Sequence, residues 1–153
     1  MKGKNHNPGA IVNRRAGFDY FLDDEIAVGL MLTGAETKSA RLGHVQLKGS
    51  YVTVKDDELW LINASFSLLS VEKGTARTVD TRARKLLAHR KQINKLIEAR
   101  KQGLTIVPTK LLIQGRYIKL IIATGRGKKK YDKRETIKKR DVDRDLRKRL
   151  AKN

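Results

Sequence analysis

Cysteine is absent from this 153-residue chain, proline occurs only twice, and aromatic residues make up 5% of the sequence. Without cysteine the chain can form no disulfide, no thiolate nucleophile and no zinc site built on cysteine. The longest apolar runs fall well short of the ~18 residues that a membrane-spanning helix needs. The N-terminus is basic and lacks the apolar stretch of a secretory signal, so we expect a cytoplasmic protein with no membrane partner.

Positive charge is abundant and unevenly distributed. The chain carries 35 Lys and Arg against 16 Asp and Glu, a formal charge of +19. Residues 16–81 hold six basic and ten acidic residues, whereas residues 82–101 hold eight basic and one acidic, and residues 124–153 hold fourteen basic and five acidic. Two basic zones of this strength are typical of proteins that bind nucleic acid, because lysine and arginine release counterions from phosphates.

The length favours one domain, since a domain typically takes roughly 100–200 residues. We predict a basic arm over residues 1–15, a folded domain over 16–123 and a basic tail over 124–153. The tail has dense charge and little apolar surface, so we expect it to be disordered when free. Apolar residues recur every four positions over 142–150, which predicts a helix that forms when a partner binds.

Short apolar segments separated by turn residues indicate antiparallel strands on both sides of a long helix. Turn residues predict hairpins through residues 23–25, through Asp56 and Asp57, and through residues 114–116. One strand is predicted to end at Pro108. The pattern favours a small β-barrel or another β-rich α+β domain.

Two helices are predicted inside this domain. Residues 34–42 have helix-compatible composition and stop at a glycine, and residues 82–102 show apolar spacing of 3.6 with a glycine just beyond the end. On the longer helix, Leu87 would lie about 100° from the buried stripe, beside lysines. Two interpretations of Leu87 stay open: an exposed contact for RNA bases, or a wider core stripe.

Motifs for catalysis or metal binding are weak. The glycines near residue 127 lack the spacing of a nucleotide-binding loop, and the three histidines lie far apart in the sequence. The acidic groups at 23–25 and 56–58 could hold Mg²⁺ for RNA cleavage, but solvated turns explain them better. We expect a non-enzymatic protein without metal or cofactor, with an RNA nuclease as a minor alternative.

Ordered motifs extend along nearly the whole chain. They are Asn-Arg-Arg-Ala at 13–16, Asp-Tyr-Phe at 19–21, Gly-Ala-Glu-Thr-Lys-Ser-Ala-Arg-Leu-Gly at 34–43, Tyr-Val at 51–52, Arg-Lys-Leu-Leu-Ala-His-Arg at 84–90, Gly-Leu-Thr-Ile-Val-Pro at 103–108 and Gly-Lys-Lys-Lys-Tyr-Asp-Lys-Arg at 127–134. With these motifs the chain resembles the SsrA-binding protein family, the bacterial partners of transfer-messenger RNA in ribosome rescue.

The resemblance implies an oligonucleotide-binding-type β-barrel with embedded helices. It further implies that the barrel binds the tRNA-like domain of transfer-messenger RNA. The tail would enter the empty mRNA channel near the decoding region of the small ribosomal subunit. Elongation factor Tu would be a further partner through the shared RNA, and no DNA partner is expected.

The resemblance also implies functional residues. A first group is expected to bind RNA, because its members lie on family RNA-binding motifs or beside them in the basic zone over residues 82–101. These are Asn13, Glu36, Lys38, Ser39, Arg41, Lys85, Leu87, His89, Lys91, Lys119, Gly127, Lys128 and Lys129. The tail residues expected to contact the ribosome are Tyr131, Asp132, Lys133, Arg134, Lys138, Lys139, Arg140, Arg144 and Arg147. Two roles are open for Glu36: it could accept hydrogen bonds from RNA, or it could orient Lys38 and Arg41.

The chain departs from the family pattern at Ala27, where many relatives carry an acid, and at Ala35 and Thr37 beside Glu36. The Ala27 departure puts one RNA contact in doubt. The second candidate function is a general RNA-binding protein that acts through charge alone. Bulk RNA would compete with such a protein, whereas recognition of a tRNA-like shape would resist that competition.

Overall fold

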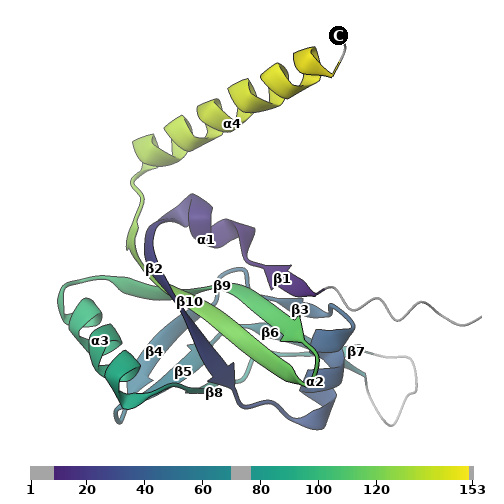
Figure 1. Cartoon of the computed structure of the whole chain (residues 1–153), viewed down its shortest axis with the longest axis vertical. Coiled ribbons are helices and arrows are strands. Elements are labelled where there is room, and N and C mark those ends of the chain that lie inside the picture. Colours follow the sequence, from purple (N-terminus) through teal and green to yellow (C-terminus); the bar gives the residue numbers. More distant parts are fainter. Residues whose placement is uncertain (1–8, 70–76, 152–153) are drawn as a thin grey trace, which may run out of the picture.

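The computed structural model describes residues 9–69 and 77–151. The predicted N-terminal arm falls mostly on residues 1–8, outside the described residues. Figure 1 shows a β-rich body from which one helix projects. In chain order the elements are β1 (Ala10–Val12), α1 (Arg14–Asp19), β2 (Tyr20–Leu30), α2 (Gly34–Arg41), β3 (Val45–Gln46), β4 (Tyr51–Lys55), β5 (Glu58–Ile62), β6 (Ser65–Leu69), β7 (Arg77–Asp80), β8 (Arg84–Leu87), α3 (Arg90–Lys101), β9 (Thr105–Gln114), β10 (Tyr117–Gly127) and α4 (Lys130–Leu150).

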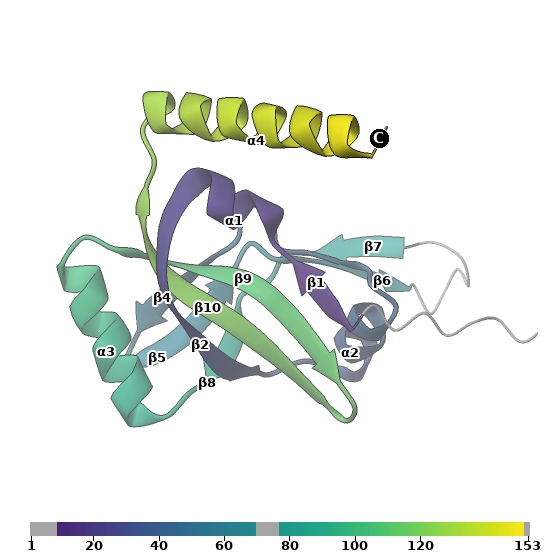
Figure 2. The same cartoon turned by 45° about the horizontal axis from the view of Figure 1, so that its top comes forward.

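The body is a large antiparallel sheet wrapped around one core. Its 7-stranded sheet has the order β1-β9-β10-β2-β8-β5-β4, and β4 also pairs with β9 through Val52 and Ile106. Six strands from β9 to β4 therefore have hydrogen-bonded neighbours on both sides. A 3-stranded sheet, β3-β6-β7, lies beside α2 (Figure 2). The β-rich α+β class is confirmed.

The core explains why these strands form. Alternate residues are buried in β5, in the second half of β9 and in the middle of β10, where Leu59, Leu61, Leu111, Leu120 and Ile122 are all fully buried. Burial of one such side chain contributes roughly 1.5–3 kcal/mol. The inward rows of β5, β9 and β10 therefore fix the register of the sheet.

Two of the predicted hairpins are confirmed. Asp56 and Asp57 connect β4 to β5 with φ angles of 51° and 57°. Left-handed values at both central residues are typical of the tight hairpin turn that aspartate tolerates. The second hairpin joins β9 to β10, where Gln114 pairs with Tyr117.

The hairpin predicted through residues 23–25 is wrong. These acids lie inside β2, a continuous strand of 11 residues. The pairing with β10 shifts between Ala123 and Gly125, so that Asp23 and Asp24 together face Thr124. This β-bulge lets two exposed acids occupy the middle of a strand without a turn.

The predicted strand end at Pro108 is also wrong. Strand β9 continues through Pro108 to Gln114, and its pairing with β10 shifts between Ile121 and Ile122. Proline has no N–H to donate to a neighbouring strand. The bulge at this position accommodates it inside the sheet.

The helix predicted over 82–102 is two elements. Arg84 and Leu86 are buried while Leu87 is exposed, so β8 alternates with the period of a strand. A buried arginine concealed this alternation, because arginine is usually solvated. Helix α3 begins only at Arg90, where the His89 N–H donates to Gln92 Oε1 at 3.0 Å. The helix predicted over 34–42 is confirmed as α2.

The tail is helical in the structure, where the sequence predicted disorder in the absence of a partner. Helix α4 contains no buried residue. It is supported locally: Asp132 accepts a hydrogen bond from the Lys129 N–H at 3.0 Å, and Arg144 lies 3.8 Å from Asp141. Such local pairs favour a helix. Within residues 9–69 and 77–151, no helix is long and apolar enough to cross a bilayer.

Candidate nucleic-acid interface

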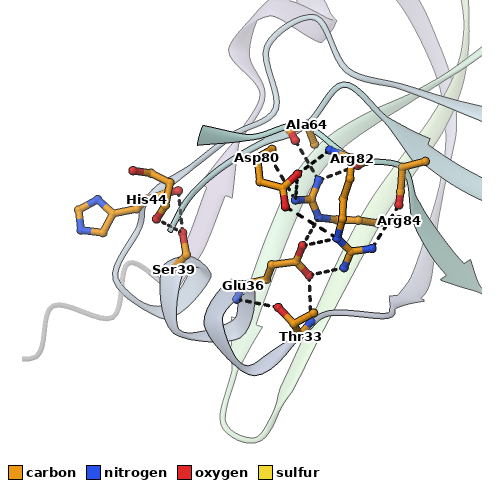
Figure 3. Close-up of polar contacts among 10 residues, drawn as sticks. Thr33, Glu36, Ser39, His44, Ala64, Asp80, Arg82 and Arg84 are labelled. Carbon is orange, nitrogen blue, oxygen red and sulfur yellow. Dashed lines mark hydrogen bonds and ion pairs between the residues drawn. The ribbon is translucent and has the colours of Figure 1, made fainter. Parts of the chain in front are cut away.

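A buried ion-pair network joins α2 to β8 (Figure 3). Glu36 is 1% exposed and Arg84 is fully buried. The Glu36 carboxylate accepts hydrogen bonds from Arg82 at 2.7 and 2.8 Å and from Arg84 Nε at 3.0 Å. It also accepts one from the Thr33 backbone N–H at 2.9 Å. A charge buried this deeply needs such partners, because an unpaired charge in the interior is strongly destabilising.

The other donors of Arg84 are satisfied by the backbone. Its Nη atoms donate to the carbonyl oxygens of Ala64, Arg82 and Asp80, at 2.8–3.2 Å. Its guanidinium carbon lies 3.9 Å from the centre of the Phe66 ring. Arg84 therefore links α2, β6 and the segment between β7 and β8 through one planar group.

Burial and pairing act in opposite directions on the ionisation of Glu36. Burial disfavours the charged carboxylate. The hydrogen bonds from Arg82 and the Thr33 N–H, together with the charge of Arg84, outweigh burial and hold the pKa of Glu36 below its ordinary value. Glu36 is therefore a permanent anion near neutral pH.

The partners of Glu36 differ from those expected. The structure pairs it with Arg82 and Arg84 rather than with Lys38 and Arg41. Both arginines fell within the segment that was predicted as helix, which hid their approach to α2. No signal in the sequence marked them, because arginine is usually solvated and its polar character hid the strand alternation of β8.

The other predicted residues of α2 lie in different settings. Ser39 is buried, and its Oγ lies 2.9 Å from two backbone carbonyl oxygens. Arg41 donates to two carbonyl oxygens of the β9–β10 turn, at 2.8 and 3.3 Å. Lys38 is exposed. Of these three side chains, Lys38 is the most accessible to RNA.

Exposed apolar and basic side chains form a row across β10, β2 and β8. Leu87 and Lys119 both pair with Gly29, so they point to the same side of the sheet. Lys85 lies two residues from Leu87 and pairs with Trp60. We call the surface formed by Met31, Trp60, Lys85, Leu87 and Lys119 the β8 face.

Leu87 is 51% exposed and does not widen the core, while its contact with RNA bases stays a prediction. Gly29 leaves room for Leu87 between the two neighbouring strands, because a Cβ added at position 29 would lie 3.1 Å from Leu87 Cβ. Sequence reasoning missed Met31, which is 51% exposed, and Trp60. Strand alternation places both on this face.

The start of α3 extends the β8 face. His89 and Lys91 are exposed at this end of the helix. Helix α3 is anchored in the core by Leu96, which is 1% exposed, and Arg90 and Lys95 also pair with Asp57 and Asp24, each at 3.3 Å. The helix therefore presents His89 and Lys91 from a fixed position.

Asn13 has a structural position. It is 9% exposed, and its Nδ2 donates to the carbonyl oxygens of Leu47 and Pro108, at 3.2 and 2.8 Å. These bonds fix the start of α1 against β9 and the segment after β3. Asn13 thus orients the neighbouring arginines.

The base of the tail is attached to α1. Lys133 Nζ lies 3.1 Å from the Asp19 carboxylate, which also pairs with Arg15 at 2.9 Å. Burial disfavours ionisation of Asp19, but hydrogen bonds from Lys133 and Arg15 outweigh it and hold the pKa of Asp19 below its ordinary value. Lys128 Nζ donates to the Gly17 carbonyl oxygen at 3.1 Å.

The other predicted residues of the tail lie just before helix α4 or along it. Gly127 is the last residue of β10 and Lys129 precedes the first turn of the helix. Asp132 and Lys133 are partly buried against the body. The predicted tail residues that are exposed along the helix are Tyr131, Arg134, Lys138, Lys139, Arg140, Arg144 and Arg147.

Replacing Asp19 with asparagine should loosen α4 from α1, because it removes the carboxylate that Lys133 and Arg15 share. Exposed ion pairs contribute little individually, so the expected change in global stability is below about 1 kcal/mol. The measurement is the distance distribution between spin labels at position 145 and position 101. It should broaden in Asp19→Asn and stay unchanged in Asp23→Asn, whereas an unchanged distribution in both would show that Asp19 does not hold the tail.

The two basic surfaces lie on opposite sides of the body. In both views α4 and α1 are at the top, whereas β8 and the start of α3 are at the bottom (Figures 1 and 2). Among residues 9–69 and 77–151, no three His, Cys, Asp or Glu residues gather as a metal site would require. Exposed basic side chains therefore lie on two separate surfaces, the β8 face and α4.

Comparisons with known proteins agree with this arrangement. The model of the family described as SmpB protein matches residues 10–152. An SsrA-binding protein of Lysinibacillus sphaericus is 46% identical over 136 residues, which cover 88% of this chain and 86% of that protein. An SsrA-binding protein of Oenococcus oeni is 44% identical over 151 residues, covering 97% of this chain and 96% of the relative.

A solved structure is similar in fold as well. It comes from work called "tmRNA-SmpB: a journey to the center of the bacterial ribosome", and the chain matches it with a TM-score of 0.66 at 35% identity. The match covers 84% of this chain and 94% of that chain. With the family model matching nearly from end to end, the chain belongs to the SmpB family of SsrA-binding proteins.

Proposed function

We propose that this chain is a non-enzymatic RNA-binding adaptor of trans-translation. It binds the tRNA-like domain of transfer-messenger RNA and delivers that RNA to stalled ribosomes in the cytoplasm. The observation that carries the proposal is the placement of two basic surfaces on opposite sides of one folded body. An adaptor needs this separation, because it must contact two large RNAs at once.

The β8 face is the proposed surface for the tRNA-like domain. We assign the ring of six paired strands to the oligonucleotide-binding type of barrel. Leu87 and His89 would contact unstacked bases of an RNA loop, while Lys85, Lys91 and Lys119 would contact phosphates. Such a surface recognises the shape of a folded loop rather than charge alone.

The tail is the proposed surface for the ribosome. Helix α4 carries exposed cations along its length and contains no fully buried residue. It is suited to the mRNA channel, where phosphates would surround it, and mRNA already in the channel would exclude it. Elongation factor Tu would join through the shared RNA rather than through a surface of this chain.

Substituting Leu87→Ala together with Lys119→Ala should weaken binding of the tRNA-like domain about 10- to 100-fold. The pair removes one apolar base contact and one charge-assisted phosphate contact. Affinity is measured at ~150 mM salt with bulk tRNA as competitor. The matched control is Val79→Ala with Lys55→Ala, which removes the same kinds of exposed side chain from outside the β8 face.

The two outcomes separate the candidate functions. Wild-type binding that survives the competitor, with a loss confined to the β8-face pair, is expected for an adaptor. Equal losses in both pairs, or displacement of wild-type protein by bulk tRNA, would instead mean that charge alone drives binding.

A further inference from the structure

A second concave surface lies away from the β8 face, between α1 and the segment around β3. It has a volume of about 490 Å³ and includes Arg14, Arg15, Phe18, Lys48 and Arg140 in its lining. We call it the α1 groove. Three separate parts of the chain build it: the β1–α1 segment, residues 45–48 and helix α4. None of the residues of the β8 face lines it.

The α1 groove concentrates positive charge. Four of its lining residues are Arg or Lys, and among residues 9–69 and 77–151 no Asp or Glu lines it. Asn13 fixes the start of α1 through two hydrogen bonds to backbone carbonyls, so Arg14 and Arg15 are presented from a rigid base. Like charges gathered in one hollow repel each other and raise the local concentration of polyanions.

An aromatic ring lies in this basic setting. Phe18 is half-buried, with the Arg15 guanidinium 4.9 Å and the Arg140 guanidinium 5.7 Å from the centre of its ring. Val12, also in the lining, is 54% exposed. Basic groups around an aromatic and apolar surface are the combination that binds unpaired nucleotides, because the bases stack while the backbone is neutralised.

We propose that the α1 groove binds a single-stranded segment of RNA. One base lies against Phe18, and the neighbouring phosphates contact Arg14, Lys48 and Arg140. This inference rests on the proposed function, which makes RNA the partner, and it adds a contact that neither the β8 face nor the far end of the tail supplies. Because Arg140 belongs to α4, the site is complete only while α4 lies over α1, so RNA in the groove and the position of the tail are coupled.

The first test uses a mixed-sequence RNA decamer that contains 4-thiouridine, photo-crosslinked to the full chain. Adducts are expected within residues 10–18, and Phe18→Leu should reduce them about tenfold because it removes the stacking ring. Lys55→Ala with Lys101→Ala, outside both the groove and the β8 face, should leave these adducts unchanged. Adducts found exclusively outside residues 10–18 would overturn the proposal.

The second test compares two double substitutions that remove equal charge. Arg14→Ala with Lys48→Ala should weaken binding of the decamer at least fivefold and reduce the slope of log affinity against log salt by about 1.4, the value for two lost phosphates on a single strand. Lys55→Ala with Lys101→Ala, away from the groove, should change neither. Equal effects of both pairs would overturn the proposal.

Two further arms identify the source of the RNA segment. Binding of the Arg14/Lys48 and Lys55/Lys101 double variants is measured with the tRNA-like domain and, separately, with small ribosomal subunits. A loss confined to the Arg14/Lys48 variant with one of these RNAs supports the groove and identifies its partner. If neither RNA shows such a loss, the proposal is overturned. The decamer tests do not depend on recognition of the tRNA-like domain, so displacement of wild-type protein by bulk tRNA would reject the proposed function and leave the crosslink result standing.

Discussion

Replacing Glu36 with alanine should lower the free energy of unfolding by about 3–5 kcal/mol. The substitution leaves Arg84 buried without its carboxylate partner, and removing one member of a buried ion pair costs this much. Arg82 would lose the same partner but is itself exposed, so its contribution is smaller. Urea denaturation followed by the fluorescence of Trp60 measures the effect.

A matched control and a conservative variant sharpen this test. Glu98→Ala removes an exposed carboxylate from α3 and should change stability by less than about 0.5 kcal/mol. Glu36→Gln keeps an acceptor for the arginines and should lose less stability than Glu36→Ala. Equal, small losses in Glu36→Ala and Glu98→Ala would contradict the assignment of Glu36 to the fold.

The same network predicts a pH dependence. The pKa of Glu36 is lowered in the folded state from an ordinary value near 4.5. Its stabilising contribution is therefore fully present above about pH 4.5 and is lost as pH falls through the folded-state pKa. Glu36→Gln should flatten this acid loss, whereas Glu98→Gln should leave the profile as steep as in the wild-type chain.

Removing the tail should abolish ribosome rescue while leaving binding of the tRNA-like domain to the β8 face nearly intact. A chain ending at Lys129 lacks α4, which contributes no buried residue to the core, so the fold should persist. A hydrogen bond to a charged group contributes about 1.5–3 kcal/mol, so the loss of only two phosphate contacts weakens ribosome binding roughly 100-fold. Rescue is measured as tagging of a stalled peptide in a purified translation system.

A charge-reversal variant controls for chain length. Lys138→Glu with Lys139→Glu keeps the helix and should fail in the same way, because the tail would then repel rRNA phosphates. Val142→Ala keeps every charge, and it should retain rescue. A truncated chain that still rescues ribosomes would show that α4 does not contact the channel.

Features governed by local chemistry could be predicted from the sequence. The Asp56–Asp57 hairpin follows from residues that tolerate left-handed backbone, and α2 follows from its helix-compatible composition and the glycine after it. Exposure of Leu87 was one of two predicted possibilities, although it lies on a strand rather than a helix. The strand pattern left a small β-barrel as one of two possible folds, and the family motifs added the expected oligonucleotide-binding type and the expected RNA partners.

Features governed by tertiary contacts could not be predicted. Arg84 has the composition of a surface residue, and only the approach of α2 places a carboxylate against it. Asp23 and Asp24 resemble a turn until β10 pairs across them with a bulge. Pro108 resembles a strand end for the same reason. In each case a long-range partner outweighs the local preference.

Protein-dependent delivery of RNA to ribosomes tests the adaptor function most directly. Labelled tRNA-like domain is sedimented with ribosomes whose mRNA channel is either vacant or filled by a long mRNA, with and without the full chain. We expect the RNA to sediment only when the protein is present and the channel is vacant. Equal sedimentation with vacant and filled channels, or without the protein, would contradict delivery by an adaptor whose tail requires an empty channel.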